Sequence, residues 1–243
     1  MIQRKEYFQS GLGSIDQLRT KSAHVHSITN TVAQNFTANI LLACGATVSM
    51  TANPDEIAGF VKKADALHVN LGTLDPERMK AIRIALSVAE EKSIPIILDP
   101  VMVHMSGLRA EFAREIAKSA SIIRGNASEM EYFDNSKQSE TCFITTGATD
   151  TICYQNAIIS VANGDRIMDR VIATGCALGA LVAALSTRAD NPMVAGLAAL
   201  IWYGVAGEVA AEKVKGPGSF IPEFLDSLYA IETATIAERA QII

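Results

Sequence analysis

Acidic and basic residues follow two short apolar segments of the chain. Asp99 comes directly after the apolar residues 96–98, and Arg124 and Glu129 come just after 121–123. A carboxylate at the end of a strand is a natural ligand of Mg²⁺, directly or through water. An arginine beside a glycine and a carboxylate can hold a nucleotide phosphate together with a metal. These residue types and positions are typical of phosphoryl-transfer chemistry.

Each of these patterns also has an ordinary structural explanation. Asp-Pro pairs such as Asp99-Pro100 are common turns, and Asn126 followed by Glu129 fits a helix cap. Thr146 and the glycine after it suit a phosphate, but Thr-Gly pairs are frequent at strand ends. The polar segment 27–39, which contains Asn30, fits helix capping as well as ligand binding. Spacing alone therefore leaves both readings open.

The segment 172–179 carries the strongest of these patterns, because it opens an Ala- and Gly-rich helix with Cys176 in its first turn. Backbone N–H groups at a helix start converge on an anion, and the helix dipole favours negative charge there. The same dipole predicts a lowered pKa for Cys176. The alternative is a buried structural cysteine, which we expect for Cys44, Cys142 and Cys153.

An α/β fold is needed to bring these residues together. Short apolar runs predict strands at 23–28, 66–71, 95–98, 121–123, 141–145 and 157–161. Asp75, Pro76 and Glu77 start a helix between two of them, and such alternation predicts a mainly parallel central sheet flanked by helices. Residues 175–211 predict two long buried helices, broken at 190–192. We expect one domain over 1–243, with ligands beyond the carboxyl ends of the strands.

Composition excludes several classes of protein. Apolar residues make up 49% of the chain and charged residues 19%, which argues against disorder. A net charge of −5 without a basic cluster argues against a nucleic-acid partner. The four cysteines form no CxxC pair, and the uncharged stretches 171–187 and 193–207 are shorter than the roughly 20 apolar residues of a membrane span. Without a signal-like segment at 1–13, we expect a cytoplasmic protein.

Taken together and in order, seven segments resemble the hydroxyethylthiazole kinase family. They are VHSITNTVAQNFTANILLACGA (25–46), ALHVNLGTL (66–74), PIILDPV (95–101), IRGNASE (123–129), TTG (145–147), ATGCALGA (173–180) and KGPGSF (215–220). The resemblance implies a ribokinase-like fold and transfer of phosphate from ATP, with Mg²⁺, to the primary alcohol of 4-methyl-5-(2-hydroxyethyl)thiazole in thiamine salvage. It also implies a homotrimer with sites between subunits.

The resemblance assigns roles to individual residues. Thiazole contacts would come from Asn30, Val32, Met50 and the backbone at Ala173, just before Cys176. ATP contacts would fall to Arg124 and Thr146, and the acids near magnesium would be Asp99 and Glu129. Cys176 would sit beside the substrate hydroxyl, where it orients the alcohol and gives modest help as a base.

Three features depart from the family pattern. Residues 102–105 (Met-Val-His-Met) replace small glycine-rich residues, and Ala173 replaces a glycine, so both changes could narrow the phosphate site. Residues 125–140 form a shorter connection than the family has. Two other functions therefore stay open: a non-catalytic protein that binds thiazole or nucleotide, and a related kinase acting on hydroxymethylpyrimidine or pyridoxal.

Overall fold

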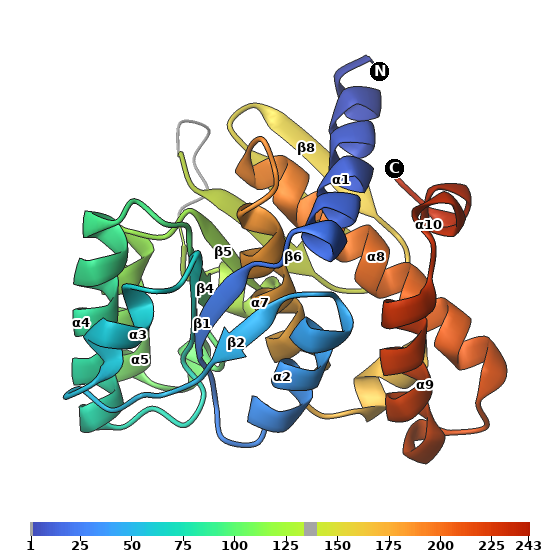
Figure 1. Ribbon diagram of the computed structural model, residues 1–243. Coiled ribbons are helices and arrows are strands. Elements are labelled where there is room, and N and C mark those ends of the chain that lie inside the picture. The colour runs from blue at the N-terminus through green and yellow to red at the C-terminus, as the bar shows by residue number, and fades with distance from the viewer. Residues whose placement is uncertain (1, 134–139) are drawn as a thin grey trace.

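The computed structural model describes residues 2–133 and 140–243 and is built on one eight-stranded sheet (Figure 1). The strand order is β2-β1-β3-β4-β5-β6-β7-β8, and all pairs from β2 to β6 are parallel. β7 and β8 continue the sheet in antiparallel pairing. The strands are β1 (His24–Ile28), β2 (Thr47–Ser49), β3 (Ala66–Asn70), β4 (Ile96–Asp99), β5 (Ile122–Asn126), β6 (Cys142–Thr146), β7 (Asp150–Tyr154) and β8 (Ala157–Val161). The predicted α/β class with a mainly parallel sheet is confirmed.

All six predicted strands are present, and two further strands were missed. β2 has only three residues and lies at one edge of the sheet. β7 has one fully buried residue, Ile152, so it lacks the apolar run that marks a central strand. The short connection predicted at 125–140 begins with helix α6 (Ala127–Met130), and its residues 134–139 lie outside the described part of the chain.

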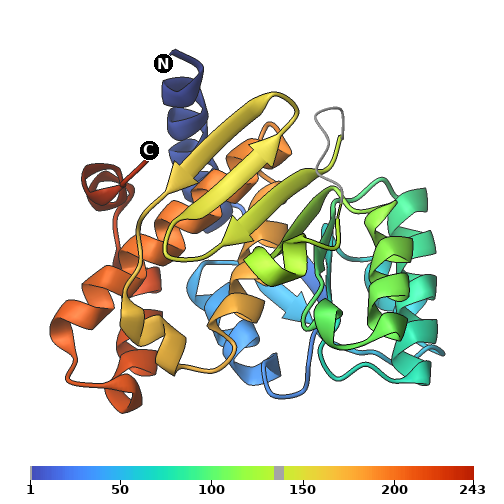
Figure 2. The same cartoon turned by 180° about the vertical axis from the view of Figure 1, so that it is seen from behind.

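Helices cover both faces of the sheet, with one apolar core on each face (Figures 1 and 2). One layer contains α1 (Ile2–Thr20), α2 (Gln34–Ala43), α7 (Thr174–Ser186), α8 (Pro192–Lys213), α9 (Pro217–Ala230) and α10 (Thr233–Arg239). The other contains α3 (Ile57–Val61), α4 (Pro76–Glu91), α5 (Gly107–Ala117) and α6. Two 3₁₀ helices, Val103–Met105 and Arg166–Arg170, lie in loops.

The long helices α7 and α8 form the centre of the larger core, as their composition predicted. α7 packs against α8, α2 and the inner strands β1, β3 and β4. α8 is the one helix in residues 2–133 and 140–243 that is long and apolar enough to span a membrane, but 89% of its most apolar window is buried inside the protein. Packing on several sides therefore accounts for the lack of charge in both helices.

The start of α4 follows the predicted capping pattern. The Asp75 carboxylate accepts a hydrogen bond of 2.7 Å from the backbone N–H of Arg78, and Pro76 occupies the first helical turn. The cap fixes where the helix begins after β3 and so fixes the loop 71–75 beside the carboxyl end of that strand. The Arg78 guanidinium, which is almost fully buried, donates to the carbonyl of Thr29 after β1. Two loops at the same edge of the sheet are thereby tied together.

Candidate active site

A row of polar side chains crosses the sheet at the carboxyl ends of four neighbouring strands. Asn70 in β3 pairs with Asp99 in β4, and Arg124 in β5 lies next to β6, which ends in Thr146. Alternation along the strands places these residues on the face that α7 covers. Parallel pairing thus brings together the predicted residues Asp99, Arg124 and Thr146 at one edge of the sheet.

Asp99 lies at the middle of this row and is almost fully buried. One carboxylate oxygen, Oδ2, accepts a hydrogen bond of 2.8 Å from Asn70 Nδ2 and lies 3.7 Å from Arg124 Nη1. The other oxygen, Oδ1, has no hydrogen-bond partner among the described residues. Burial raises the pKa of Asp99 to about 6, although Arg124 and the Asn70 amide act in the opposite direction.

Arg124 links the carboxylate to the strand beyond it. Its Nη2 donates 2.9 Å to the Thr146 hydroxyl, which in turn donates to the Gly125 carbonyl at 3.2 Å. The guanidinium lies directly under the start of α7, because a Cβ built at Gly175 would come within 3.0 Å of Nη1. Gly175 therefore allows a fixed positive charge to lie against the amino end of a helix, where anions bind.

Glu129 is also buried, and both of its carboxylate oxygens accept backbone N–H groups. Oε2 accepts from Asn126 at 3.0 Å, and Oε1 accepts from Met102 at 2.9 Å. Asn126 accepts from the Glu129 N–H in return, which completes a capping box. The capping role left open by the sequence is thus confirmed. The carboxylate also lies close enough to Asp99 for its charge to help raise the Asp99 pKa.

Cys176 lies in the first turn of α7, and the amide of Asn30 donates to its sulfur over 3.2 Å. The prediction of a lowered pKa is wrong. Burial, and then the negative charge of Asp99, raise the pKa of Cys176 to about 11, while hydrogen bonds from Asn70 and Asn30 lower it only in part. The loss of solvent outweighs the helix dipole, so the side chain is a neutral thiol near pH 7.

Asn30 follows β1 and is held against the backbone of the loop after β3. A Cβ added at Gly72 would lie 2.4 Å from the Cβ of Asn30, so only glycine allows this approach. The Asn30 amide reaches Cys176 and, at 3.4 Å, the side-chain oxygen of Asn70. The structure therefore brings together Asn30 and Cys176, which the sequence predicted, with Asn70, which it did not.

Val32 and Met50 lie on the loops that follow β1 and β2. Val32 is 65% exposed, and Met50 is half-buried at the edge of the sheet beyond β2. Val32 is therefore uncovered by the rest of the described chain. The expected thiazole contacts of these two residues stay a prediction.

The departures at Ala173 and Met102 lie at unusual backbone conformations. Ala173 precedes α7 with φ 72°, and Met102 precedes the 3₁₀ helix Val103–Met105 with φ 57°. Both values fall in the left-handed region, where a side chain is disfavoured and glycine is not. Alanine and methionine are thus accommodated at these turns with backbone strain.

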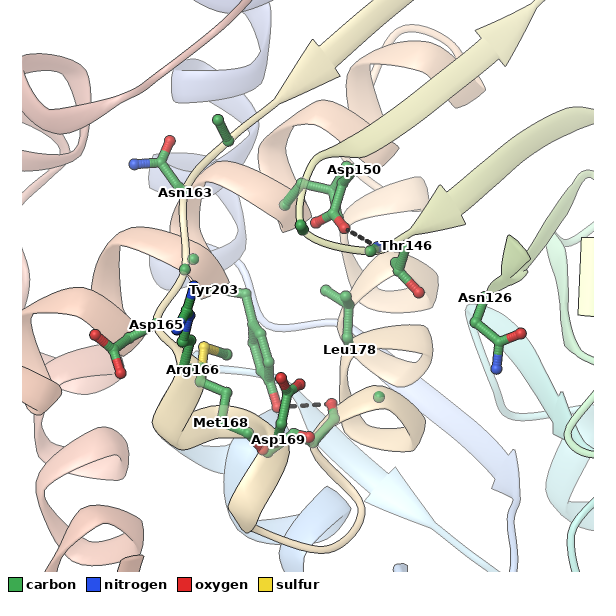
Figure 3. A pocket seen from close by; sticks show the side chains of 18 of the residues that line it. Asn126, Thr146, Asp150, Asn163, Asp165, Arg166, Met168, Asp169, Leu178 and Tyr203 are labelled. Atoms are coloured by element: carbon green, nitrogen blue, oxygen red, sulfur yellow. Dashed lines mark hydrogen bonds between the residues drawn. The ribbon is translucent and has the colours of Figure 1, made fainter. Parts of the chain in front are cut away.

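A cleft of about 920 Å³ opens beside the polar row. Figure 3 shows Asn126 and Thr146 on one side of it and Asp165 and Arg166 on the other, with Tyr203 between them. The buried Tyr203 hydroxyl donates 2.9 Å to the carbonyl of Thr174, at the first residue of α7. This hydrogen bond ties the floor of the cleft to the helix that carries Cys176.

The far wall of the cleft, 163–170, rests on glycines of α8. A Cβ at Gly204 would lie 2.7 Å from the Cβ of Asn163, and one at Gly207 would lie 2.5 Å from the sulfur of Met168. The Asn163 amide donates to Glu208 at 3.0 Å, also in α8. Sequence analysis missed this wall and Tyr203, because the wall has no regular hydrophobic pattern and Tyr203 lies within an apolar helix.

A second buried polar pair lies on the same face of the sheet, where β1 and β3 are neighbours, two residues before Asn70 in β3. Ser27 Oγ and His68 Nδ1 are 2.9 Å apart, which satisfies one nitrogen of the ring. The other nitrogen, Nε2, has no hydrogen-bond partner among the described residues. It lies against Gly179 of α7, where an added Cβ would be only 2.8 Å away.

Comparison with known proteins agrees with this arrangement. The family model described as "Hydroxyethylthiazole kinase family" matches residues 15–139 and 134–234. A probable hydroxyethylthiazole kinase of Agrobacterium fabrum is 41% identical over 229 residues, covering 94% of this chain and 92% of the relative. A hydroxyethylthiazole kinase of Granulibacter bethesdensis is 37% identical, with 92% and 91% covered.

Solved structures show the same fold. The hydroxyethylthiazole kinase structure from Pyrococcus horikoshii superposes with a TM-score of 0.90 at 30% identity, covering 96% of this chain and 98% of that one. Pyridoxal kinase from Staphylococcus aureus, solved with AMP-PCP and pyridoxal, matches with a TM-score of 0.59 at 14% identity, covering 77% and 88%. The latter likeness shows the fold alone, and the predicted ribokinase-like fold is confirmed. The chain belongs to the hydroxyethylthiazole kinase family.

Proposed function

We propose that the protein phosphorylates the primary alcohol of 4-methyl-5-(2-hydroxyethyl)thiazole, using ATP and Mg²⁺, in thiamine salvage. Membership of a family of phosphotransferases gives the reaction class. The observation that carries the assignment to this site is the contact of Asn30 with Cys176, beside Asp99 and Arg124 at one edge of the sheet. The chain acts as one kinase domain over 1–243 in the cytoplasm.

ATP binds along the cleft, with its terminal phosphates at Arg124 and Thr146. The guanidinium already lies under the amino end of α7 and is oriented by the Thr146 hydroxyl. Phosphoryl transfer depends mainly on positioning and on neutralising charge, so a fixed arginine at a helix start stabilises the transferred group. The volume of about 920 Å³ leaves room for the rest of a nucleotide.

Magnesium is held near Asp99 and Glu129. The buried Asp99 Oδ1, which has no partner within 2–133 and 140–243, fits the cation as a ligand or through a water. Glu129 already accepts two backbone N–H groups, so it acts through water or by its charge alone. No group of three acidic, His or Cys side chains lies together in those ranges, so in this proposal phosphates and water would supply most of the Mg²⁺ ligands. Bound Mg²⁺ neutralises negative charge on the phosphates.

The thiazole lies near Asn30, Val32, Met50 and the backbone at Ala173, with its alcohol beside Cys176. Because Val32 is 65% exposed in one subunit, the proposal includes a homotrimer in which a neighbouring subunit completes the site.

Cys176 orients the alcohol as a thiol and does not act as a strong base. Its pKa of about 11 leaves little thiolate near pH 7, and the loose transition state of phosphoryl transfer needs little base strength. The Asn30 amide donates to the sulfur, which leaves the S–H hydrogen free to point elsewhere. Cys176→Ala should therefore lower kcat without abolishing turnover, and full turnover would remove the orienting role.

The decisive experiment is phosphorylation of the thiazole alcohol by purified protein with ATP and Mg²⁺, with mass spectrometry of the product. Hydroxymethylpyrimidine and pyridoxal are assayed beside it, and the thiazole should be the preferred acceptor. A preference for either competitor would favour a related kinase. Thiazole binding by calorimetry without product at any Mg²⁺ concentration would favour a non-catalytic binding protein, a reading supported by the strained Met102 and Ala173.

A further inference from the structure

Asn70 is a fully buried residue at the carboxyl end of β3 that contacts both ends of the site. Its Nδ2 donates 2.8 Å to Asp99, on the side assigned to phosphate and metal. Its Oδ1 lies 3.4 Å from the Asn30 amide, on the side assigned to the thiazole. No other residue with these two contacts is present among the described side chains.

The orientation of the Asn70 amide is fixed by the backbone. The N–H of Gly72 donates 2.9 Å to Asn70 Oδ1, and a backbone N–H can only donate. The oxygen of the amide must therefore face the loop, and its NH₂ group must face Asp99. Because Oδ2 of Asp99 is occupied by this donor, the unpartnered Oδ1 is the oxygen left for an incoming ligand.

The same amide continues the chain of hydrogen bonds toward Cys176. Asn30 Nδ2 donates both to Asn70 Oδ1 and, at 3.2 Å, to the Cys176 sulfur. Hydrogen bonds in series polarise one another in a buried site, so a charge placed at one end changes the strength of the bonds at the other. Asp99 and Cys176 are thus connected through Asn70, both by its own hydrogen bond to the sulfur and by way of Asn30.

We propose that Asn70 is a positioning residue that couples the nucleotide end of the site to the alcohol end. It holds Asp99 in the orientation that receives the nucleotide and, through Asn30, holds Cys176 where the thiazole binds. Occupation of either end strengthens binding at the other. This inference takes the identity of the two ligands from the proposed function. It gives Asn70 a coupling role that neither Asp99 nor Cys176 has.

The test is calorimetry of the intact protein with the thiazole alcohol, in the presence and absence of Mg²⁺ and β,γ-methylene-ATP. In the wild type, the nucleotide analogue should tighten thiazole binding by about 5- to 150-fold, the usual range of coupling between sites. In Asn70→Ala this ratio should fall close to one. Asn70→Leu, which keeps the number of side-chain heavy atoms and the branch at Cγ but removes the amide, provides a second variant if the first does not fold.

The matched control is Ser27→Ala, which removes one buried hydrogen bond to His68 on the same face of the sheet, a bond that is not part of the chain from Asp99 through Asn70 and Asn30. It should keep the wild-type coupling ratio, because a ratio of two affinities is insensitive to a general loss of stability. An unchanged ratio in folded Asn70 variants, or a wild-type ratio of one, would overturn the inference. Coupled binding without any phosphorylated product would refute the proposed function alone.

Discussion

Replacing Ala173 by glycine should make the protein more stable. Ala173 has φ 72°, where its Cβ crowds the backbone, and it lies at the turn that leads into α7. Glycine adopts this conformation without the steric cost, so the replacement lowers the free energy of the folded state. It also lowers the free energy of the unfolded state, because glycine gives the unfolded chain more conformational freedom, and this second effect acts against the first.

The balance of the two effects can be estimated. A left-handed residue other than glycine costs about 1–2 kcal/mol, and the extra freedom of glycine in the unfolded chain offsets about 0.4–1 kcal/mol of that gain. The two ranges together give a stabilisation of about 0 to 1.6 kcal/mol, and their midpoints give about 0.8 kcal/mol for Ala173→Gly. For a chain of this size, 1 kcal/mol changes Tm by roughly 2–4 °C, so the expected rise is about 1–4 °C.

Differential scanning calorimetry of Ala173→Gly beside Ala183→Gly is the assay. Ala183 lies within α7, three residues before its last residue, and is fully buried, so glycine there should lower stability by about 1 kcal/mol or more. Opposite signs for the same chemical change are the expected result. If Ala173→Gly lowers Tm as Ala183→Gly does, the left-handed turn at 173 is not a source of strain.

Three further outcomes follow from the site. Because the pKa of Cys176 is about 11, its alkylation by iodoacetamide at pH 8, followed by peptide mass spectrometry, should be about 100-fold slower than that of a thiol of pKa 9.0. The rate should rise about tenfold per pH unit up to pH 10, and a plateau by pH 9 would contradict this. Gly179→Ala should lower the free energy of unfolding, measured by thermal unfolding, by about 1–3 kcal/mol, because the new Cβ would be 2.8 Å from His68 Nε2. Gly13→Ala, at an open position of α1, should not destabilise the protein. Arg124→Lys should lower kcat/KM for ATP by roughly 10- to 100-fold, since lysine lacks the planar guanidinium that contacts both Thr146 and Asp99. A near-normal kcat/KM would show that Arg124 does not bind the phosphates.

Five of the six predicted strands contain a run of at least three buried residues, and the sixth, β8, was recognised from its apolar residues although Ile158 is exposed. β3 and β4 are fully buried along their length, which requires the continuous apolar runs that were recognised. β2 and β7 lie toward the edges of the sheet; β2 has no buried residue and β7 has one, so neither has such a run. Their pairing is decided by neighbouring strands, which a single stretch of sequence does not contain.

The residues of the candidate site also include some that the sequence predicted and some that it did not. Asp99 and Arg124 were recognised because each lies at the end of an apolar run and because the motifs around them resemble a known family. Asn70 was missed because it belongs to the run ALHVN, and its importance depends on Asp99 in the neighbouring strand. The pKa of Cys176 was predicted in the wrong direction because the helix start is visible in the sequence, but the burial of the thiol and the facing Asp99 are not.

The change from parallel to antiparallel pairing at β6 implies an order of assembly. β6, β7 and β8 join residues close in sequence, so this meander closes short loops, whereas every parallel pair must first close a crossover. We expect the meander to form early, with Thr146 already in place. Asn30 and Asp99 come together only when the parallel half of the sheet closes. Closure of the parallel half then brings Arg124 and Asp99 to Thr146 in the same step that brings Asn30 to Asp99, so a single late step of folding completes both ends of the proposed site.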